Sequence, residues 1–479
     1  MTGRYCRFSL MVLSQEELNR VGAAVRKDIS ASALREASGM ATATPAGAPA
    51  VFSVLQGQSN AGFLNTEIQN VSGGYFSIYQ PIVQSLTGVA HTALGTLLTS
   101  DPSGGLTIVA GTPTYATDTI NAALWLDPHA TCSTLTSPAT WVAGAAGAKV
   151  QAYLESHVTP KTVTGAQAPG ATAAVPVIFI RAHSESDSQM APTESTFYQA
   201  ANRRFVLLAR TWAGKSAVQM PVFYMGWPTT NSAVSGAKDV IRLAWTADAR
   251  LTRFNAHWGS LATYDVANRV PPVPPDGLHT DLTGDHQDAC RLAISVSRWM
   301  HDNGHSANDL SWLPRQGPRI VAIALVAGEA SALDVFVRHD GGTDIIVPAA
   351  PRYDAFQIMD GPSYTVRRNV TAITRLTSSS FRLTLDSALV FPGSEVFLDF
   401  CQANDFYGLG SLITDNFHTD AVVKPAAWSV VTSLFPAVAL SLCKIDFPLN
   451  AGQTIALTDV GGGVTATSPP PAPPQSGSS

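Results

Sequence analysis

Alternation of short apolar runs with amphipathic helical segments is the feature that most constrains how residues 51–305 can fold. The apolar runs have the length of strands, and segments with helical periodicity lie between them. Because a strand, a helix and a second strand form a right-handed unit, this order predicts a parallel sheet covered by helices on both faces. The expected strands are 51–55, 106–110, 175–180 and 221–225, and the expected helices are 141–157, 196–212, 236–252 and 286–301.

Beyond Pro318 the pattern changes to short strand-like segments separated by Gly, Pro, Asp and Asn. Such segments without intervening helices are typical of an all-β domain of the sandwich type, expected over residues 318–460. The final segment, 461–479, is rich in Pro and Ser and is expected to be disordered or extended. The predicted strands are 319–326, 333–338, 381–385, 396–400 and 453–457.

Residues 1–50 are expected to lie outside the main domain. Ser14 and Glu17 have the spacing of a capping box, and apolar residues then recur at helical spacing, which predicts a helix over 14–37. Residues 38–50 are rich in Ala, Thr, Gly and Pro and indicate a linker. The helix could pack on the main domain or bind a partner chain.

Composition and charge exclude some classes of partner. Charged residues make up 14% of the chain and the net charge is −5, so the basic surface of a nucleic-acid-binding protein is not expected. No apolar run approaches the roughly 20 residues that cross a bilayer, and the run 8–13 is short for a signal peptide. A neutral carbohydrate substrate fits this balance. The location stays undetermined, and export as part of a phage particle stays open.

The five cysteines are odd in number and form no C-x-x-C pair. This spacing favours buried free thiols over a disulfide framework or a zinc motif. Asp and His pairs such as Asp127 with His129 and Asp285 with His286 are more simply explained as solvated residues than as metal ligands. Four tryptophans could stack on sugars, although core packing is the simpler role for most of them: Trp125, Trp227, Trp245 and Trp258.

The first chemical motif is Gly57-Gln58-Ser59-Asn60, directly after the expected strand 51–55. A serine there would lie at the carboxyl end of a parallel strand, where ligand sites of α/β proteins form. Gly57 permits a tight turn, and the Ser59 N–H could face a developing oxyanion. A turn or helix-cap role for Ser59 is the alternative. Position 61 is Ala, so the G-x-S-x-G nucleophile elbow of α/β-hydrolases is absent here.

The second motif is Asp276-Gly277-Leu278-His279, which follows a proline-rich loop. A serine hydroxyl needs a base in order to attack a carbonyl at neutral pH, and a carboxylate orients the imidazole that acts as this base. A second D-x-x-H occurs at Asp415 and His418. It ranks lower because it lies in the β-rich region, whereas His279 precedes an expected helix of the α/β region.

The third motif is the polar run 183–187, His-Ser-Glu-Ser-Asp, after the expected strand 175–180. Polar side chains crowded at the end of a buried strand are costly to bury without a purpose. The alternative is a capped helix start, with Asp187 in its first turn.

In this order the three motifs resemble those of the SGNH hydrolases, and more closely the branch of sialate O-acetylesterases and acetylxylan-esterase-like carbohydrate esterases. That branch carries a GQSN block, a QGESD-like block and a final DxxH block. Here GQSN is intact at 57–60 and DGLH at 276–279 matches the last block. In the middle block His183 and Ser184 replace Gln and Gly, while 185–187 is retained. The resemblance covers residues 51–305, about half of the chain.

The resemblance implies a flavodoxin-like three-layer α/β sandwich and hydrolysis of O-acetyl groups on sugars without a cofactor or metal. It implies that Ser59 is the nucleophile, His279 the base and Asp276 its orienting carboxylate. The oxyanion donors would be the Ser59 N–H, a glycine after the second strand and a side chain of the middle block. The candidates for oxyanion and substrate binding are Gly111, His183, Gln58, Asn60 and Glu185.

Three functions fit these observations. The first is a carbohydrate O-acetylesterase that works through an acetyl-Ser59 intermediate. The second is a glycan-binding or structural protein on the same scaffold, such as a phage tail component, whose β domain or N-terminal helix contacts the particle. The third is a lipase or thioesterase of the same superfamily. The sequence has no long apolar segment of the kind that forms a lipase lid, so this function has less support.

Overall fold

The structure is a computed structural model of the chain. It describes part of the 479 residues, and the N-terminal helix and linker expected over 1–50 lie outside that part. The described residues are 51–57, 75–98, 126–127, 140–158, 176–182, 192–225, 245, 248–249, 254–260, 282–315, 318–326, 328–339, 342–360, 366–389, 395–400, 412–416, 444–448, 454–459 and 464–466.

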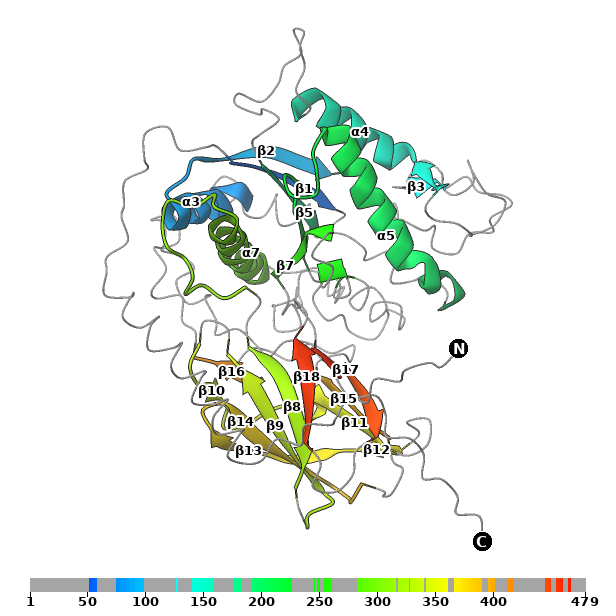
Figure 1. Ribbon diagram of the computed structural model, residues 1–479, viewed down its shortest axis with the longest axis vertical. Helices are drawn as coiled ribbons and strands as arrows, with labels where there is room; N and C mark the ends of the chain where they lie inside the picture. Colours follow the sequence, from blue (N-terminus) through cyan, green and yellow to red (C-terminus); the bar gives the residue numbers. More distant parts are fainter. Residues whose placement is uncertain are drawn as a thin grey trace, which may run out of the picture.

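A five-stranded parallel sheet forms the centre of the mixed α/β part (Figure 1). Its order is β2-β1-β5-β6-β7, which is the order 2-1-3-4-5 of flavodoxin-like sheets. The predicted central strands 51–55, 175–180 and 221–225 are confirmed. The strands are β1 (Val51–Gly57), β2 (His91–Leu98), β5 (Val177–Ala182), β6 (Val222–Met225) and β7 (Ala256–Ser260).

The two edge strands, β2 and β7, were not predicted. Their sequences, HTALGTLL and AHWGS, mix polar and small residues with apolar ones, so neither forms the continuous apolar run of a strand buried on both faces. The predicted strand 106–110 lies outside the described residues.

Helices cover both faces of the sheet. α3 (Tyr75–Thr87) packs with α7 (Leu282–Asp302) on one face, and α4 (Ala145–His157) packs with α5 (Pro192–Ala213) on the other. Side chains of β1 alternate between these two apolar layers, because successive residues of a strand point to opposite faces. Val51 and Leu55 join the α3–α7 layer, while Phe52 and Val54 join the α4–α5 layer.

The helix predictions over 141–157, 196–212 and 286–301 are confirmed, whereas α3 was not predicted. Of the expected helix 236–252, only Trp245, Asp248 and Ala249 are described, and each is helical. A short antiparallel pair, β3 (Leu126–Asp127) with β4 (Val142–Ala143), lies near α4. Among the described residues no helix is long and apolar enough to span a membrane.

Antiparallel sheets follow the α/β part, and all five predicted strands are present. Residues from the six-stranded and the four-stranded sheet share one apolar core, which includes Ile323, Val335, Phe356 and Phe381. The six-stranded sheet contains β13 (Val370–Thr377), β14 (Ser380–Leu385), β9 (Ala332–Arg338), β8 (Arg319–Leu325), β18 (Thr454–Asp459) and β19 (Val464–Ala466). The four-stranded sheet contains β12 (Val366–Arg368), β11 (Phe356–Asp360), β15 (Glu395–Phe400) and β17 (Lys444–Pro448). A two-stranded sheet pairs β10 (Ile345–Ile346) with β16 (Thr414–Asp415).

A short strand lies within the segment 461–479, which was expected to be disordered or extended. β19 (Val464–Ala466) pairs antiparallel with β18 across the intervening glycines. Since Val and Thr are β-branched and favour strands, these residues extend the sheet before the proline-rich segment begins.

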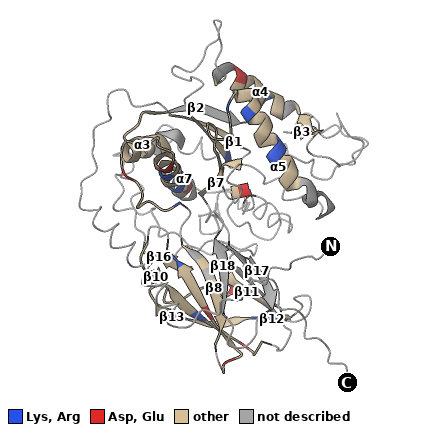
Figure 2. Cartoon of the chain, in the orientation of Figure 1, with Lys and Arg blue, Asp and Glu red and all other residues tan. Residues whose placement is uncertain are grey.

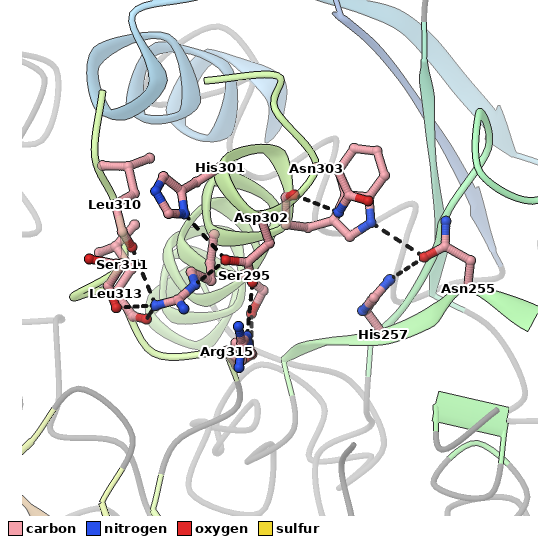
Figure 3. A network of polar contacts seen from close by, with 12 residues as sticks. Asn255, His257, Ser295, His301, Asp302, Asn303, Leu310, Ser311, Leu313 and Arg315 are labelled. Carbon is pink, nitrogen blue, oxygen red and sulfur yellow. Dashed lines mark hydrogen bonds and ion pairs between the residues drawn. The ribbon is translucent and has the colours of Figure 1, made fainter. Parts of the chain in front are cut away.

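A connector, residues 303–315, joins α7 to the strands and packs onto the helices (Figure 3). The Arg298 guanidinium donates hydrogen bonds to the carbonyls of Leu310, Ser311 and Leu313. Arg315 pairs with Asp302 at 2.9 Å, and the buried Leu313 belongs to the α3–α7 layer. The packed α/β part therefore continues beyond residue 305, the expected end of the domain, to Arg315.

We expect a chain that ends after Ser311 to unfold at a lower temperature than a chain that ends after Arg315. The shorter chain loses the buried Leu313 side chain, worth roughly 1.5–3 kcal/mol, and the Arg315–Asp302 pair. Thermal unfolding of the two chains measures this difference. Equal unfolding temperatures would contradict the role of the connector.

Candidate functional site

All residues proposed from the three motifs lie outside the described residues. They are Ser59, Gln58, Asn60, Gly111, His183, Glu185, Asp276 and His279. The structure nevertheless describes the elements that border each motif, because it includes Gly57 at the end of β1, Ala182 at the end of β5 and Leu282 at the start of α7. The first two motifs begin at these strand ends, and the third motif ends just before Leu282.

The ends of β1 and β5 lie side by side in register. Gln56 pairs with Arg181, and Gly57 pairs with Ala182. β1 is followed by α3 on one face of the sheet, and β5 is followed by α5 on the other face. The boundary between β1 and β5 is therefore the topological switch point, outside which open α/β sheets bind ligands. The GQSN motif and the polar run 183–187 begin at this one place.

The direction of α7 places its first residue toward the same edge of the sheet. The Trp299 indole N–H donates to the side chain of Asn255, which precedes β7, at 3.3 Å. The Ser295 hydroxyl donates to the carbonyl of Gly259, near the carboxyl end of β7, at 3.2 Å. The helix thus runs antiparallel to the strand, and Leu282 lies toward the carboxyl edge. The D-x-x-H motif ends three residues before Leu282.

A buried polar network lies directly beneath the two strand ends. Gln56, Arg181 and Asn202 are each fully buried. Arg181 donates from Nη1 to Gln56 Oε1 at 2.6 Å and from Nε to Asn202 Oδ1 at 2.9 Å. Its guanidinium carbon lies 4.7 Å from the centre of the Phe205 ring, a cation–π distance. The network therefore joins β1, β5 and α5, one residue before the GQSN motif and two residues before the run 183–187.

The network continues to a buried carboxylate. Asn202 Nδ2 donates to Tyr224 Oη at 2.7 Å and to Asp248 Oδ2 at 3.1 Å, and Arg203 donates to Asp248 Oδ1 at 2.5 Å. Burial raises the pKa of Asp248, and the Arg203 guanidinium opposes that rise. Burial and the neighbouring Asp248 raise the pKa of Tyr224 well above its usual value, so its phenol stays protonated.

Sequence reasoning missed this network, although it left one signal. Arg181 is the one Lys, Arg, Asp or Glu residue in the five strands of the parallel sheet, and the parts of these strands that Figure 2 colours are mostly tan. A charge within the apolar run VIFIRA is costly to bury unless hydrogen bonds compensate it. Such a residue therefore marks a strand position with polar partners.

A different Ser–His pair is buried between β1, β2 and α3. Ser53 Oγ lies 2.8 Å from His91 Nε2 and 2.9 Å from Tyr79 Oη. Burial lowers the pKa of His91 to about 3, and its Nδ1 has no hydrogen-bond partner among the described residues. All three side chains are enclosed, and His91 begins its strand at the opposite edge from the motifs. The cluster is therefore a packing contact.

Other proposed residues also take structural positions where the structure describes them. Trp245 and Trp258 are buried in the α4–α5 layer, and Trp245 stacks on Tyr224, so these two are not sugar platforms. Cys290 is buried and forms no disulfide, as predicted. Asp415, of the lower-ranked D-x-x-H, is buried in β16 among the antiparallel strands, and His418 lies outside the described residues. No cluster of metal-ligand residues occurs among those described.

No protein-family model and no curated protein matches the sequence. A solved structure of a carbohydrate acetylesterase from Xanthomonas citri aligns with 82% of this chain and 80% of its own, at 12% identity and a TM-score of 0.47. Two structures of a bacterial S-layer protein align with 58% of this chain and with 54% and 35% of theirs, at 9% identity and TM-scores of 0.19 and 0.20. At such TM-scores the functional argument rests on this chain's own residues.

Proposed function

We propose that this chain is a serine esterase that removes O-acetyl groups from a carbohydrate. The observation that carries the proposal is the register of β1 with β5, which brings the starts of the GQSN motif and of the run 183–187 together at the switch point of the sheet. The proposal is also supported by the direction of α7, whose first residue, Leu282, lies toward the same edge and follows the D-x-x-H motif by three residues in the sequence.

The proposed mechanism is acyl transfer through the serine. His279 accepts the Ser59 proton as the hydroxyl attacks the acetyl carbonyl, and Asp276 holds the imidazole in the required tautomer. The sugar hydroxyl leaves with the proton that His279 returns to it. Water then gives a proton to His279 and attacks the carbonyl carbon of acetyl-Ser59. The bond between that carbon and Ser59 Oγ breaks, His279 returns the proton to Oγ, and acetate is released. In these reaction steps, protein side chains transfer the protons, and backbone N–H groups and side chains stabilise the charge that develops.

In the same proposal, preorganised hydrogen-bond donors stabilise the negative charge of the tetrahedral intermediate. These are the Ser59 N–H, the backbone of a glycine after the second strand, for which Gly111 is the candidate, and His183. The described second strand of the sheet is β2 (His91–Leu98), so a glycine closer to Leu98 competes with Gly111 for this role. Gln58, Asn60 and Glu185 are the proposed substrate contacts.

Acetate release from a panel of acetylated glycans, beside 4-nitrophenyl acetate, tests the proposal. The wild-type chain is expected to release acetate from at least one glycan, and Ser59→Ala serves as the negative control. Activity on long-chain esters or thioesters alone would instead favour a lipase or thioesterase. Hydrolysis of none of these substrates would overturn the esterase proposal.

The antiparallel strands after Pro318 favour a second candidate, a glycan-binding or particle-surface protein. We propose that these strands form a separate accessory domain, because they share an apolar core of their own. Binding of the intact chain to a polysaccharide that it does not deacetylate would favour this candidate.

The middle motif leads to a quantitative prediction. If His183 donates to the oxyanion, His183→Ala should lower kcat by roughly 10²- to 10³-fold with little change in KM, because the oxyanion exists only beyond the ground state. His183→Gln restores an amide donor and should retain much of the activity. Steady-state kinetics on 4-nitrophenyl acetate measures both variants. Unchanged kcat in both would make His183 a structural residue.

A further inference from the structure

We propose that Gln56, oriented by Arg181, donates a hydrogen bond into the catalytic centre that begins at Gly57. The inference rests on the proposed esterase function and adds a residue that none of the three motifs contains. Gln56 directly precedes Gly57 and lies three positions before Ser59.

Arg181 fixes which way the Gln56 amide faces. A guanidinium only donates hydrogen bonds, so the atom of Gln56 that lies 2.6 Å from Nη1 must be the carbonyl oxygen. The amide nitrogen then faces away from Arg181. Arg181 is itself held by Asn202 and by the Phe205 ring, and Asn202 is held by Tyr224 and Asp248. The orientation of Gln56 is therefore set by a rigid chain of contacts across three strands and a helix.

The Gln56 Nε2 group is buried and has no hydrogen-bond partner in the part of the chain that the structure describes. An unsatisfied buried donor destabilises the folded state, and the great majority of buried polar atoms have a hydrogen-bond partner. This donor lies at the end of β1, beside the switch point where α/β proteins bind ligands. A donor held ready at the place where an oxyanion would form stabilises the transition state without reorganisation. This is the role that we assign to it.

Gln56→Glu separates a catalytic donor from a structural acceptor. Glutamate keeps an oxygen for Arg181 and nearly the same shape, but it lacks the N–H₂ group. We expect this variant to unfold at or above the wild-type temperature, while its kcat on 4-nitrophenyl acetate falls by roughly 10²-fold with KM little changed. Gln56→Met, which adds no charge, should lose kcat to a similar degree. Wild-type kcat in both variants would overturn the inference.

Arg181→Met tests the orienting role, and Arg210→Met is its matched control. Arg210 is also buried, and it lies over the Phe254 ring at 5.1 Å. It donates to the carbonyls of Met220 and Phe254, which precede β6 and β7 and so lie at the opposite edge of the sheet. Both variants should lose stability, but only Arg181→Met should lose kcat. Equal kcat in the two variants would contradict the orienting role.

A double-mutant cycle between Gln56→Met and Arg181→Met completes the test. If Arg181 acts through Gln56, its substitution should not lower kcat further once Gln56 has been replaced. Additive losses would contradict that route. Different results would overturn the proposed function as a whole. These are a wild-type chain that hydrolyses no ester, or an activity that survives Ser59→Ala. An active wild type with an inactive Ser59→Ala and a fully active Gln56→Glu overturns only the role of Gln56.

Discussion

Replacement of Ser59 by Ala is expected to reduce acetyl-ester hydrolysis on the order of 10⁴- to 10⁶-fold while the chain stays folded. The alanine variant has no oxygen to attack the carbonyl, so no acetyl-enzyme forms. The backbone N–H groups and the substrate contacts remain, and they sustain only the residual rate. Hydrolysis of 4-nitrophenyl acetate measures the loss, and circular dichroism shows that the fold is intact.

Ser53→Ala is the matched control for this variant. Ser53 lies in the same strand and also contacts a histidine, His91, but the pair is enclosed between β1, β2 and α3. Its loss should lower the unfolding temperature and leave kcat nearly unchanged. Ser59→Ala activity within tenfold of the wild type, in a correctly folded chain, would rule out Ser59 as the nucleophile.

Replacement of His279 by Ala is expected to produce a loss similar to that of Ser59→Ala, because the serine hydroxyl then has no base. His418→Ala should be nearly silent, since Asp415 of that motif is buried among the antiparallel strands. The same kinetic assay on the two variants decides between the motifs. The reverse pattern would assign the base to His418.

The pH dependence of the wild type provides an independent check on the base. A catalytic histidine of ordinary pKa, near 6.5, must be neutral to accept a proton, so kcat/KM should fall as the pH drops through about 6.5. His91 and His257 cannot cause an inflection there, because burial lowers their pKa to about 3 and about 4. Figure 3 shows His257 beside Asn255, to which it is hydrogen-bonded at 2.7 Å. Loss of the inflection in His279→Ala would connect it to that residue.

The central strands of the sheet could be predicted because of their burial. β1, β5 and β6 have neighbours on both sides and helices on both faces, so nearly every residue must be apolar, and such runs are visible in the sequence. The edge strands β2 and β7 each have a neighbouring strand on one side only, so their positions tolerate polar and small residues. Because their composition is mixed, neither strand could be recognised in the sequence. α3 was missed although Tyr79, Ile82, Val83 and Leu86 lie on its buried face.

The amino-acid sequence alone shows which residue types are available for chemistry and in which order they occur. GQSN follows one strand, 183–187 follows another, and a D-x-x-H precedes the last helix of the α/β part. The sequence did not reveal which strands are neighbours. Pairing of β1 with β5, 125 residues apart at Gln56 and Arg181, is decided by the packing of both apolar layers at once. The Arg181 network is likewise a tertiary feature, because the partners of a buried charge come from strands and helices that only folding brings together.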